Sequence, residues 1–305
     1  DVAREACRLL GIDEADVVVD ATRRPNLSVC DGRDLRDREG ALVSVVAPGQ
    51  KTIVYVSSRD QSVQLVRTLR HRLPELADRI AFYNAGLPRE VRARVERAFR
   101  DGGLSCIVST SAFGEGVNLP DVRDVVLYGL PYGAVELNQM SGRAGRDGLP
   151  ARVHMLFSAR DMRVNERVIS QAAPARDDLV ALYRAIRTLA DASGRLTSSD
   201  EELLAMTARV APALHVSEQE VQSGLSVFAE LGFLTVCGWG EKRCIVVETS
   251  PARMELARSA RYLEGENLRE EFREFADWVF SCPCEELLAH IDRPITPGFG
   301  STVTE

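Results

Sequence analysis

Lysine is almost absent from this sequence, and long apolar runs are absent altogether. Of the 38 basic residues, 36 are arginine, a bias that a GC-rich coding sequence would also give. No stretch approaches the roughly 18 apolar residues that span a membrane, and no charged-then-apolar signal peptide begins the chain. The sequence therefore predicts a cytoplasmic protein without a membrane partner.

Metal-ligand patterns are also missing. The seven cysteines are scattered and odd in number, which favours a reducing compartment over a disulfide framework. A zinc site built from Cys237, Cys244, Cys282 and Cys284 is conceivable, but neither pair has the usual C-x2-4-C spacing on both sides. The first pair brackets a Gly-Trp-Gly turn, so its thiols could instead face each other across a hairpin. The four histidines are isolated from carboxylates and cysteines, and we expect no metal site.

The distribution of charge is more informative than its sum. The net charge of −7 does not by itself point to nucleic acid. Residues 250–305 hold eleven acidic residues against six arginines, so this region would repel DNA and should face solvent or a protein. Arginine elsewhere is suited to bidentate recognition of phosphate.

Length and pattern predict about two domains, the first of the α/β class. Residues 51–157 alternate between short β-branched runs and amphipathic helical stretches, the pattern of βαβ units on a parallel sheet. We expect strands over 51–58, 79–83, 104–110, 124–128 and 151–157. Residues 1–50 hold a short helix (2–10), a strand (17–20) and an extended Arg24-Pro25-Asn26-Leu27 segment.

The composition changes after residue 176. Helices are expected over 177–190, near 200–209, and from a Ser217-x-x-Glu220 capping box to Leu231, followed by a hairpin with Trp239 at its tip. Three helices and a hairpin indicate a winged-helix-like α+β domain over 177–249. The remaining residues, 250–305, are expected to form an acidic helical tail.

The strongest motif lies at residues 139–148, Gln-Met-Ser-Gly-Arg-Ala-Gly-Arg-Asp-Gly. Arg143 and Arg146 are three residues apart, which would place them on the same side of a helical turn. Gly142 and Gly145 would let that face approach another surface closely. Two guanidinium groups on one patch can neutralise a polyphosphate with bidentate hydrogen bonds.

Polar residues and glycines also follow three of the predicted strands. Parallel sheets place ligands at the carboxyl ends of their strands, and glycines there let backbone amides meet phosphate. We therefore expected one polyanion surface, shared with the two arginines on the carboxyl side of the sheet. The candidate residues are Ser57, Ser58, Arg59, Gly86, Ser109, Thr110, Gly114, Gly116 and Asn118.

With these motifs in place, residues 51–172 resemble the second RecA-like domain of superfamily 2 helicases, and most closely the RecQ type. The resemblance rests on the 139–148 string, on Ala-Phe-Gly-Glu-Gly-Val-Asn at 112–118, and on Arg24-Pro25-Asn26, which resembles the segment that enters this domain in RecQ helicases. It implies an ATP-dependent DNA helicase domain.

The resemblance also implies roles for individual residues. Arg143 and Arg146 would be arginine fingers that reach the γ-phosphate of ATP. Four residues would bind the nucleotide and couple it to the DNA strand: Gln139, Gly114, Gly116 and Asn118. Ser57, Ser58, Arg59, Gly86, Ser109 and Thr110 would hold single-strand phosphates.

The chain departs from the family in what it lacks. No G-x-x-x-x-G-K-[ST] loop and no Asp-Glu-x-His box occur. ATP and Mg²⁺ would therefore be shared with a first motor domain of the same polypeptide. Residues 1–50 would be the segment that connects that domain to this one. We expect no cofactor to bind this chain alone. The chain begins with Asp1, and we interpret it as part of a longer protein. The RecQ zinc cysteines are absent as well.

The C-terminal half resembles, more diffusely, the tail of bacterial RecJ-type single-strand exonucleases. This suggests a helicase fused to a 5'-3' exonuclease whose metal site lies upstream, because no Asp-His-His string occurs in these 305 residues. The predicted partner is single-stranded or partly duplex DNA. The alternatives are an RNA helicase and a non-catalytic nucleic-acid-binding or scaffolding module that keeps the fold.

Overall fold

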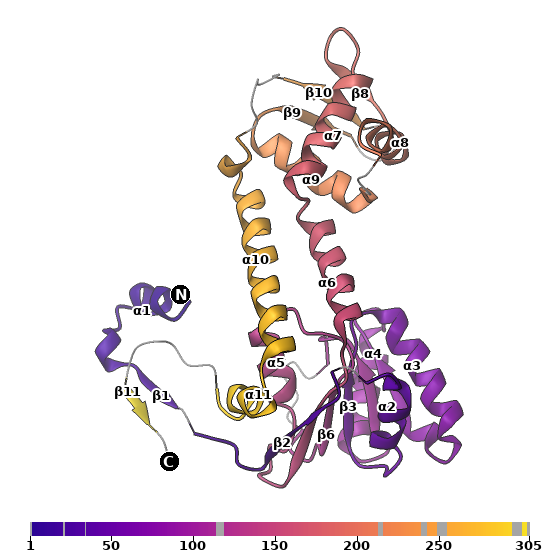
Figure 1. Cartoon of the computed structure of the whole chain (residues 1–305), viewed down its shortest axis with the longest axis vertical. Helices are drawn as coiled ribbons and strands as arrows, with labels where there is room; N and C mark the ends of the chain where they lie inside the picture. Colours follow the sequence, from indigo (N-terminus) through magenta and orange to yellow (C-terminus); the bar gives the residue numbers. More distant parts are fainter. Residues whose placement is uncertain are drawn as a thin grey trace. The chain divides into compact units, whose positions relative to one another are not determined.

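A computed structural model describes residues 2–20, 22–33, 35–113, 119–212, 216–238, 243–248, 255–294 and 301–303 (Figure 1). The chain divides into two compact units. Unit 1 comprises Asp1–Met162 and Phe275–Glu305, and unit 2 comprises Arg163–Glu274. The end of the predicted tail thus belongs with the first unit, whereas the sequence suggested one tail running from residue 250.

The centre of unit 1 is a parallel sheet of six strands, which confirms the predicted α/β class. Its strand order is β2 (Leu27–Asp31), β7 (Ala151–Met155), β6 (Asp124–Leu127), β3 (Thr52–Tyr55), β5 (Cys106–Ser109) and β4 (Ile80–Tyr83). The five predicted strands are all present. The sixth, β2, extends the Arg24–Leu27 segment, and as a partly exposed edge strand it lacks a continuous apolar run.

Helices pack on this sheet through their apolar stripes. They are α2 (Arg38–Val46), α3 (Arg59–Arg72), α4 (Arg89–Arg100) and α5 (Ala134–Ser141), with a 3-10 turn η2 (Pro74–Arg79) between α3 and β4. Leu42, Leu69 and Phe99 are fully buried, as are the strand residues Ile53 and Val126. All four residues of β3, β5 and β6 are buried, which fixes the sheet as the core of unit 1.

Further elements complete unit 1 at both ends of the chain. The first residues form α1 (Val2–Leu10), η1 (Glu14–Asp16) and β1 (Val18–Asp20), which pairs in parallel with β11 (Ser301–Val303). Helix α11 (Cys284–Ile291) contacts α5 and β2. Two long helices, α6 (Ala159–Ala172) and α10 (Ala260–Ser281), begin or end in unit 1 and continue in unit 2.

Unit 2 has the topology of a winged helix. Its elements are α7 (Arg176–Leu189), β8 (Arg195–Thr197), α8 (Asp200–Val210), α9 (Glu218–Glu230), β9 (Leu234–Cys237), β10 (Cys244–Val247) and η4 (Leu256–Arg258). The three strands form an antiparallel sheet in the order β8-β10-β9. Cys237 and Cys244 are directly paired across the β9–β10 hairpin, and Trp239 lies outside the described residues. The three-residue strand β8 was too short to be predicted from the sequence.

Within the described ranges, none of the helices is both long enough and apolar enough to cross a lipid bilayer.

Candidate nucleotide and nucleic-acid site

The loops after β3 and β4 are joined by a small hydrogen-bond network. Asn84 donates from Nδ2 to Ser62 Oγ (3.1 Å), and its Oδ1 accepts from the Gly86 amide (3.0 Å). Ser62 Oγ donates to the Arg59 carbonyl (2.6 Å). A Cβ placed on Gly86 would lie 3.6 Å from an Arg59 guanidinium nitrogen, so the two predicted residues are neighbours. Asn84, which is buried, holds them together.

Ser58 begins α3 as its N-cap residue. Its hydroxyl accepts the Gln61 amide (3.1 Å), while the Ser57 amide donates to Gln61 Oε1 (3.1 Å). Ser58 and Arg59 are exposed at this helix start, where free backbone donors and the helix dipole favour an anion. The sequence prediction therefore places these residues correctly at one strand end.

The strand end of β5 differs from the prediction at Ser109. Its side chain is fully buried and donates to the carbonyl of Thr110 (2.7 Å), so the hydroxyl is not directed to a ligand. Thr110 itself is half-buried beside a cavity of about 40 Å³ that Tyr55, Ser57 and Glu136 also line. Gly114, Gly116 and Asn118 lie outside the described residues.

Glu136 is a polar residue of this cavity that the sequence gave no reason to select. Burial raises the pKa of its carboxyl group, and hydrogen bonds from the Tyr132 amide (2.7 Å) and Ser111 oppose that shift. We refer to Ser57–Arg59, Asn84–Gly86 and Thr110, at the carboxyl ends of β3, β4 and β5, as the strand-end surface.

Arg143 and Arg146 lie on a turn rather than on a helix. Helix α5 ends at Ser141, and residues 142–149, here called the arginine turn, follow in consecutive turns. Gly145 has a φ of +53°, which ends the helical path. The two arginines, which the sequence predicted on one side of a helical turn, thus follow the end of α5 with Gly145 between them.

Gly145 was expected to let the arginines approach another surface, but its missing side chain makes room inside unit 1. A Cβ at this position would lie 2.6 Å from Asn26 Nδ2 and 2.7 Å from the Cβ of Ala151. The missing side chain thus permits close packing inside unit 1 instead of approach to another surface.

The turn nevertheless brings the two guanidinium groups together. The pKa of Arg146 is lowered by burial and then by the charge of Arg143. Burial raises the pKa of Tyr55 to about 12, against the opposing effect of both arginines and of a hydrogen bond with Arg143. Tyr55 is buried and donates from its hydroxyl to the Phe113 carbonyl (3.3 Å). Arg143 is half-buried, and Arg146 and Gln139 are exposed.

The backbone of the arginine turn lies apart from the strand-end surface, although the Arg143 side chain reaches Tyr55 at the end of β3. The amide of Gly145 donates to Val122 (2.8 Å) and that of Asp147 to Pro120 (3.1 Å), and both acceptors precede β6. The turn therefore lies toward the amino ends of β6 and β7, whereas the strand-end surface lies at the carboxyl ends. Tyr55 connects them, because it ends β3 and its hydroxyl reaches Arg143.

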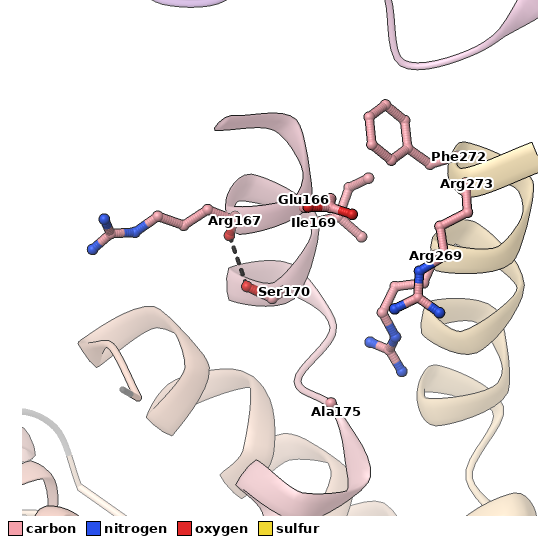
Figure 2. A pocket seen from close by; sticks show the side chains of 8 residues that line it. All are labelled: Glu166, Arg167, Ile169, Ser170, Ala175, Arg269, Phe272 and Arg273. Carbon is pink, nitrogen blue, oxygen red and sulfur yellow. Dashed lines mark hydrogen bonds between the residues drawn. The ribbon is translucent and has the colours of Figure 1, made fainter. Parts of the chain in front are cut away.

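A cavity of about 560 Å³ in unit 2 has arginines in its wall but does not gather them (Figure 2). Arg269 and Arg273 extend from α10, while Arg167 extends from the far side of α6 (Figure 2). Arg269 is already bonded to the Ala173 carbonyl and to Glu266, so its charge is compensated inside the chain. This cavity therefore offers no convergent group for chemistry.

In the described parts of the chain, no three His, Cys, Asp or Glu side chains gather as a metal site would require. His154 instead contacts Asp124, with 2.7 Å between Nε2 and Oδ1.

Comparison with known proteins agrees with this architecture. Residues 38–148 match the family model described as the helicase conserved C-terminal domain. The chain is 30% identical, over 52% of its own length and 24% of the relative, to the ATP-dependent DNA helicase RecQ of Pasteurella multocida. It is 28% identical, over 56% of its length and 31% of the relative, to a putative ATP-dependent RNA helicase, R290, of Acanthamoeba polyphaga mimivirus.

One similar solved structure is the helicase Lhr of Mycobacterium smegmatis bound to single-stranded DNA and AMP-PNP. The match covers 75% of this chain and 32% of that protein, with 17% identity and a TM-score of 0.39. The chain covers 24% of the RecQ helicase and 31% of the R290 protein, so it spans less than a third of either relative.

Residues 38–148 of unit 1 thus match the family model of a helicase C-terminal domain. They are similar to that domain of ATP-dependent DNA helicases of the RecQ type.

Proposed function

We propose that this chain provides the second motor domain of an ATP-dependent DNA helicase. The observation that carries the proposal is the arginine turn, where Arg143 and Arg146 lie close enough for one to lower the pKa of the other. Two like charges held close together repel each other, and an anion bound between them would remove that cost. A polyphosphate is the anion that paired guanidinium forks fit best.

Arg143 and Arg146 would act as arginine fingers. Their guanidinium groups would stabilise the negative charge that develops on the γ-phosphate while it is transferred to water. The turn offers donors for phosphate oxygens, so it fits the phosphate end of ATP. Mg²⁺ and the rest of the nucleotide would be held by a first motor domain, since the sequence has no P-loop.

The strand-end surface would bind the phosphates of a single DNA strand. Ser58 and Thr110 supply hydroxyl groups there and Arg59 a guanidinium group, with Ser57 and Gly86 beside them. Gln139, Gly114, Gly116 and Asn118 would relay the state of the nucleotide to this surface.

The test is to measure DNA-stimulated ATP hydrolysis by a polypeptide that contains both motor domains. Arg146→Ala should lower turnover by about 10³–10⁵-fold, the range attributed to an arginine finger, and Arg143→Ala by a similar or smaller factor. Single-strand binding should persist in both variants. Arg167→Ala, an exposed arginine in unit 2, is the matched control and should keep wild-type turnover.

The alternative is a module that keeps the fold but catalyses nothing. Near-wild-type turnover in both arginine variants would favour that reading. The chain alone should hydrolyse no ATP, so activity in the purified chain would also contradict the proposed division of labour.

We propose further that the protein carrying this chain also holds a RecJ-type exonuclease. This rests on the resemblance of the C-terminal half, and the comparisons described above do not bear on it. Two-metal hydrolysis of a phosphodiester needs a cluster of Asp and His ligands. A coding sequence with no such cluster before the first motor domain would overturn the proposal.

A further inference from the structure

The arginine turn is held from outside the part of the chain that matches the helicase family model. Arg24 donates from Nη1 to the Gly142 carbonyl (3.3 Å) and from Nη2 to the Ala144 carbonyl. These carbonyls belong to the residues before and after Arg143, so one guanidinium fork holds the backbone on both sides of that residue.

Asn26 fixes the other half of the turn. Its Nδ2 donates to the carbonyls of Gly145 (2.8 Å) and Leu149 (2.9 Å). Only a glycine leaves room for this contact, because a Cβ at position 145 would lie 2.6 Å from the same nitrogen. The side-chain amide of Asn26 therefore restrains the peptide bond between Gly145 and Arg146.

The C-terminal end of α11 supports both segments. The Arg24 amide donates to the Asp292 carbonyl (2.6 Å). Asn138, the neighbour of Gln139 on α5, donates from Nδ2 to the carbonyls of His290 (2.9 Å) and Arg293 (3.2 Å). Residues 24–26, α5 and α11 thus form one hydrogen-bonded brace around the arginine turn, all within unit 1.

Arg24 is a half-buried cation that lies close to the positively charged Arg146. Burial lowers its pKa, and the charge of Arg146 lowers it further. A cation that served only to link surface segments would lie in solvent, away from two other cations. Here it is half-buried among carbonyl oxygens, the acceptors that compensate it, and adds to the positive potential of the turn.

We propose that Arg24 and Asn26 are positioning residues that lock the backbone of the arginine turn for phosphate. The inference rests on the proposed role of Arg143 and Arg146. A displacement of about 1 Å at a reacting centre can cost roughly 10²-fold in rate, so a loosened turn should affect turnover more than binding.

The first measurement is amide hydrogen exchange on this chain, which needs no ATPase activity. In Arg24→Ala, the amides of residues 143–149 should exchange at least about tenfold faster, while those of β3 and β5 stay protected. Arg24→Lys keeps the charge and should recover part of the protection. Arg23→Ala, at the exposed neighbouring arginine, is the matched control and should exchange like wild type.

The second measurement is the steady-state ATPase of a polypeptide with both motor domains. Arg24→Ala and Asn26→Ala should lower kcat by roughly 10–10² while KM for ATP changes less than about twofold. If Arg24→Ala fails to fold, judged by circular dichroism, the smaller change Asn26→Ala carries the same test.

The outcomes separate the two ideas. Unchanged exchange in the turn overturns the positioning role of Arg24 and Asn26. Faster exchange with an unchanged kcat leaves that role standing and removes the arginine-finger function from the proposal above. Lower kcat with equally raised KM would show that Arg24 contacts ATP, and would overturn a role limited to positioning.

Discussion

Asp124 shows how a single buried charge is tolerated in the sheet. Its side chain is fully buried and accepts hydrogen bonds from Arg152 at 2.9 Å and 3.2 Å, with His154 Nε2 at 2.7 Å. Burial alone would raise the pKa of this carboxyl group. The hydrogen bonds from His154 and Arg152 outweigh burial, so the pKa is held below its ordinary value.

Replacing this carboxylate should therefore destabilise unit 1 in a pH-dependent way. Because the folded-state pKa is depressed, the stabilisation is present above the unfolded pKa of about 3.9 and is lost as the pH falls through the folded value. At pH 7 Asp124→Asn should cost about 2–3 kcal/mol. This is less than the ~3–5 kcal/mol of a fully buried pair, because the Arg152 side chain is 48% exposed.

Urea unfolding of wild type and Asp124→Asn, followed at pH 7 and at pH 3, checks this prediction. The difference in unfolding free energy should shrink at the lower pH. A constant difference across that range would show that the carboxylate is not the source of the effect.

The sequence could predict some site residues and not others, for physical reasons. Parallel strands place their carboxyl ends together, so Ser58, Arg59 and Gly86 could be assigned to one edge from their order alone. Ser109 could not be separated from Thr110, because strand alternation decides which hydroxyl faces inward. Arg24 and Asn26 gave no sign that they contact a turn about 120 positions later.

At the level of elements, the helices of unit 2 begin with reciprocal caps. In α9, Glu220 accepts the Ser217 amide (2.5 Å) and the Ser217 hydroxyl accepts the Glu220 amide (3.3 Å). This is the predicted capping box, and α8 has another with Ser199 and Glu202. Each satisfies backbone donors that have no partner inside the helix.

Removing the α9 cap should lower the stability of unit 2 alone. Ser217→Ala should cost about 1–2 kcal/mol, since the backbone amide of Glu220 then loses its acceptor, the Ser217 hydroxyl. Ser226→Ala, on an exposed face of the same helix, is the matched control and should change stability by no more than about 0.5 kcal/mol.

Hydrogen exchange resolved by segment is the measurement, because it reports each unit separately. Faster exchange is expected in α7–α9 with unit 1 unaffected. Equal effects of Ser217→Ala and Ser226→Ala would mean that the capping box contributes little.

Helices and strands were predictable where the local pattern of apolar residues alone determines the backbone conformation. Buried strands such as β3 and β5 stand out because they are short runs rich in apolar and β-branched residues. The path of the chain after α5 could not be predicted, because Gly142 keeps helical angles and the path changes only at Gly145. That change is set by packing against Asn26, a long-range contact that helical spacing does not encode.

At the scale of the whole molecule, the net charge and the proposed ligand have the same sign. The chain carries −7 at neutral pH, so any attraction for DNA must come from local arginines and backbone donors. On the strand-end surface, Arg59 is the charged side chain among hydroxyl and amide groups. Binding by this chain should accordingly be weak and should depend on few ionic contacts.

The last prediction follows from counterion release. For a single strand, the slope of log K against log salt is about −0.7 per phosphate contact. With three or four contacts, affinity for an oligothymidine should fall by about 10–10² between 50 and 200 mM salt, measured by fluorescence anisotropy. Arg59→Ala should reduce the slope by about 0.7, whereas Arg23→Ala should leave it unchanged. Equal affinity at both salt concentrations would mean that stacking on bases, and not phosphate recognition at the strand-end surface, holds the strand.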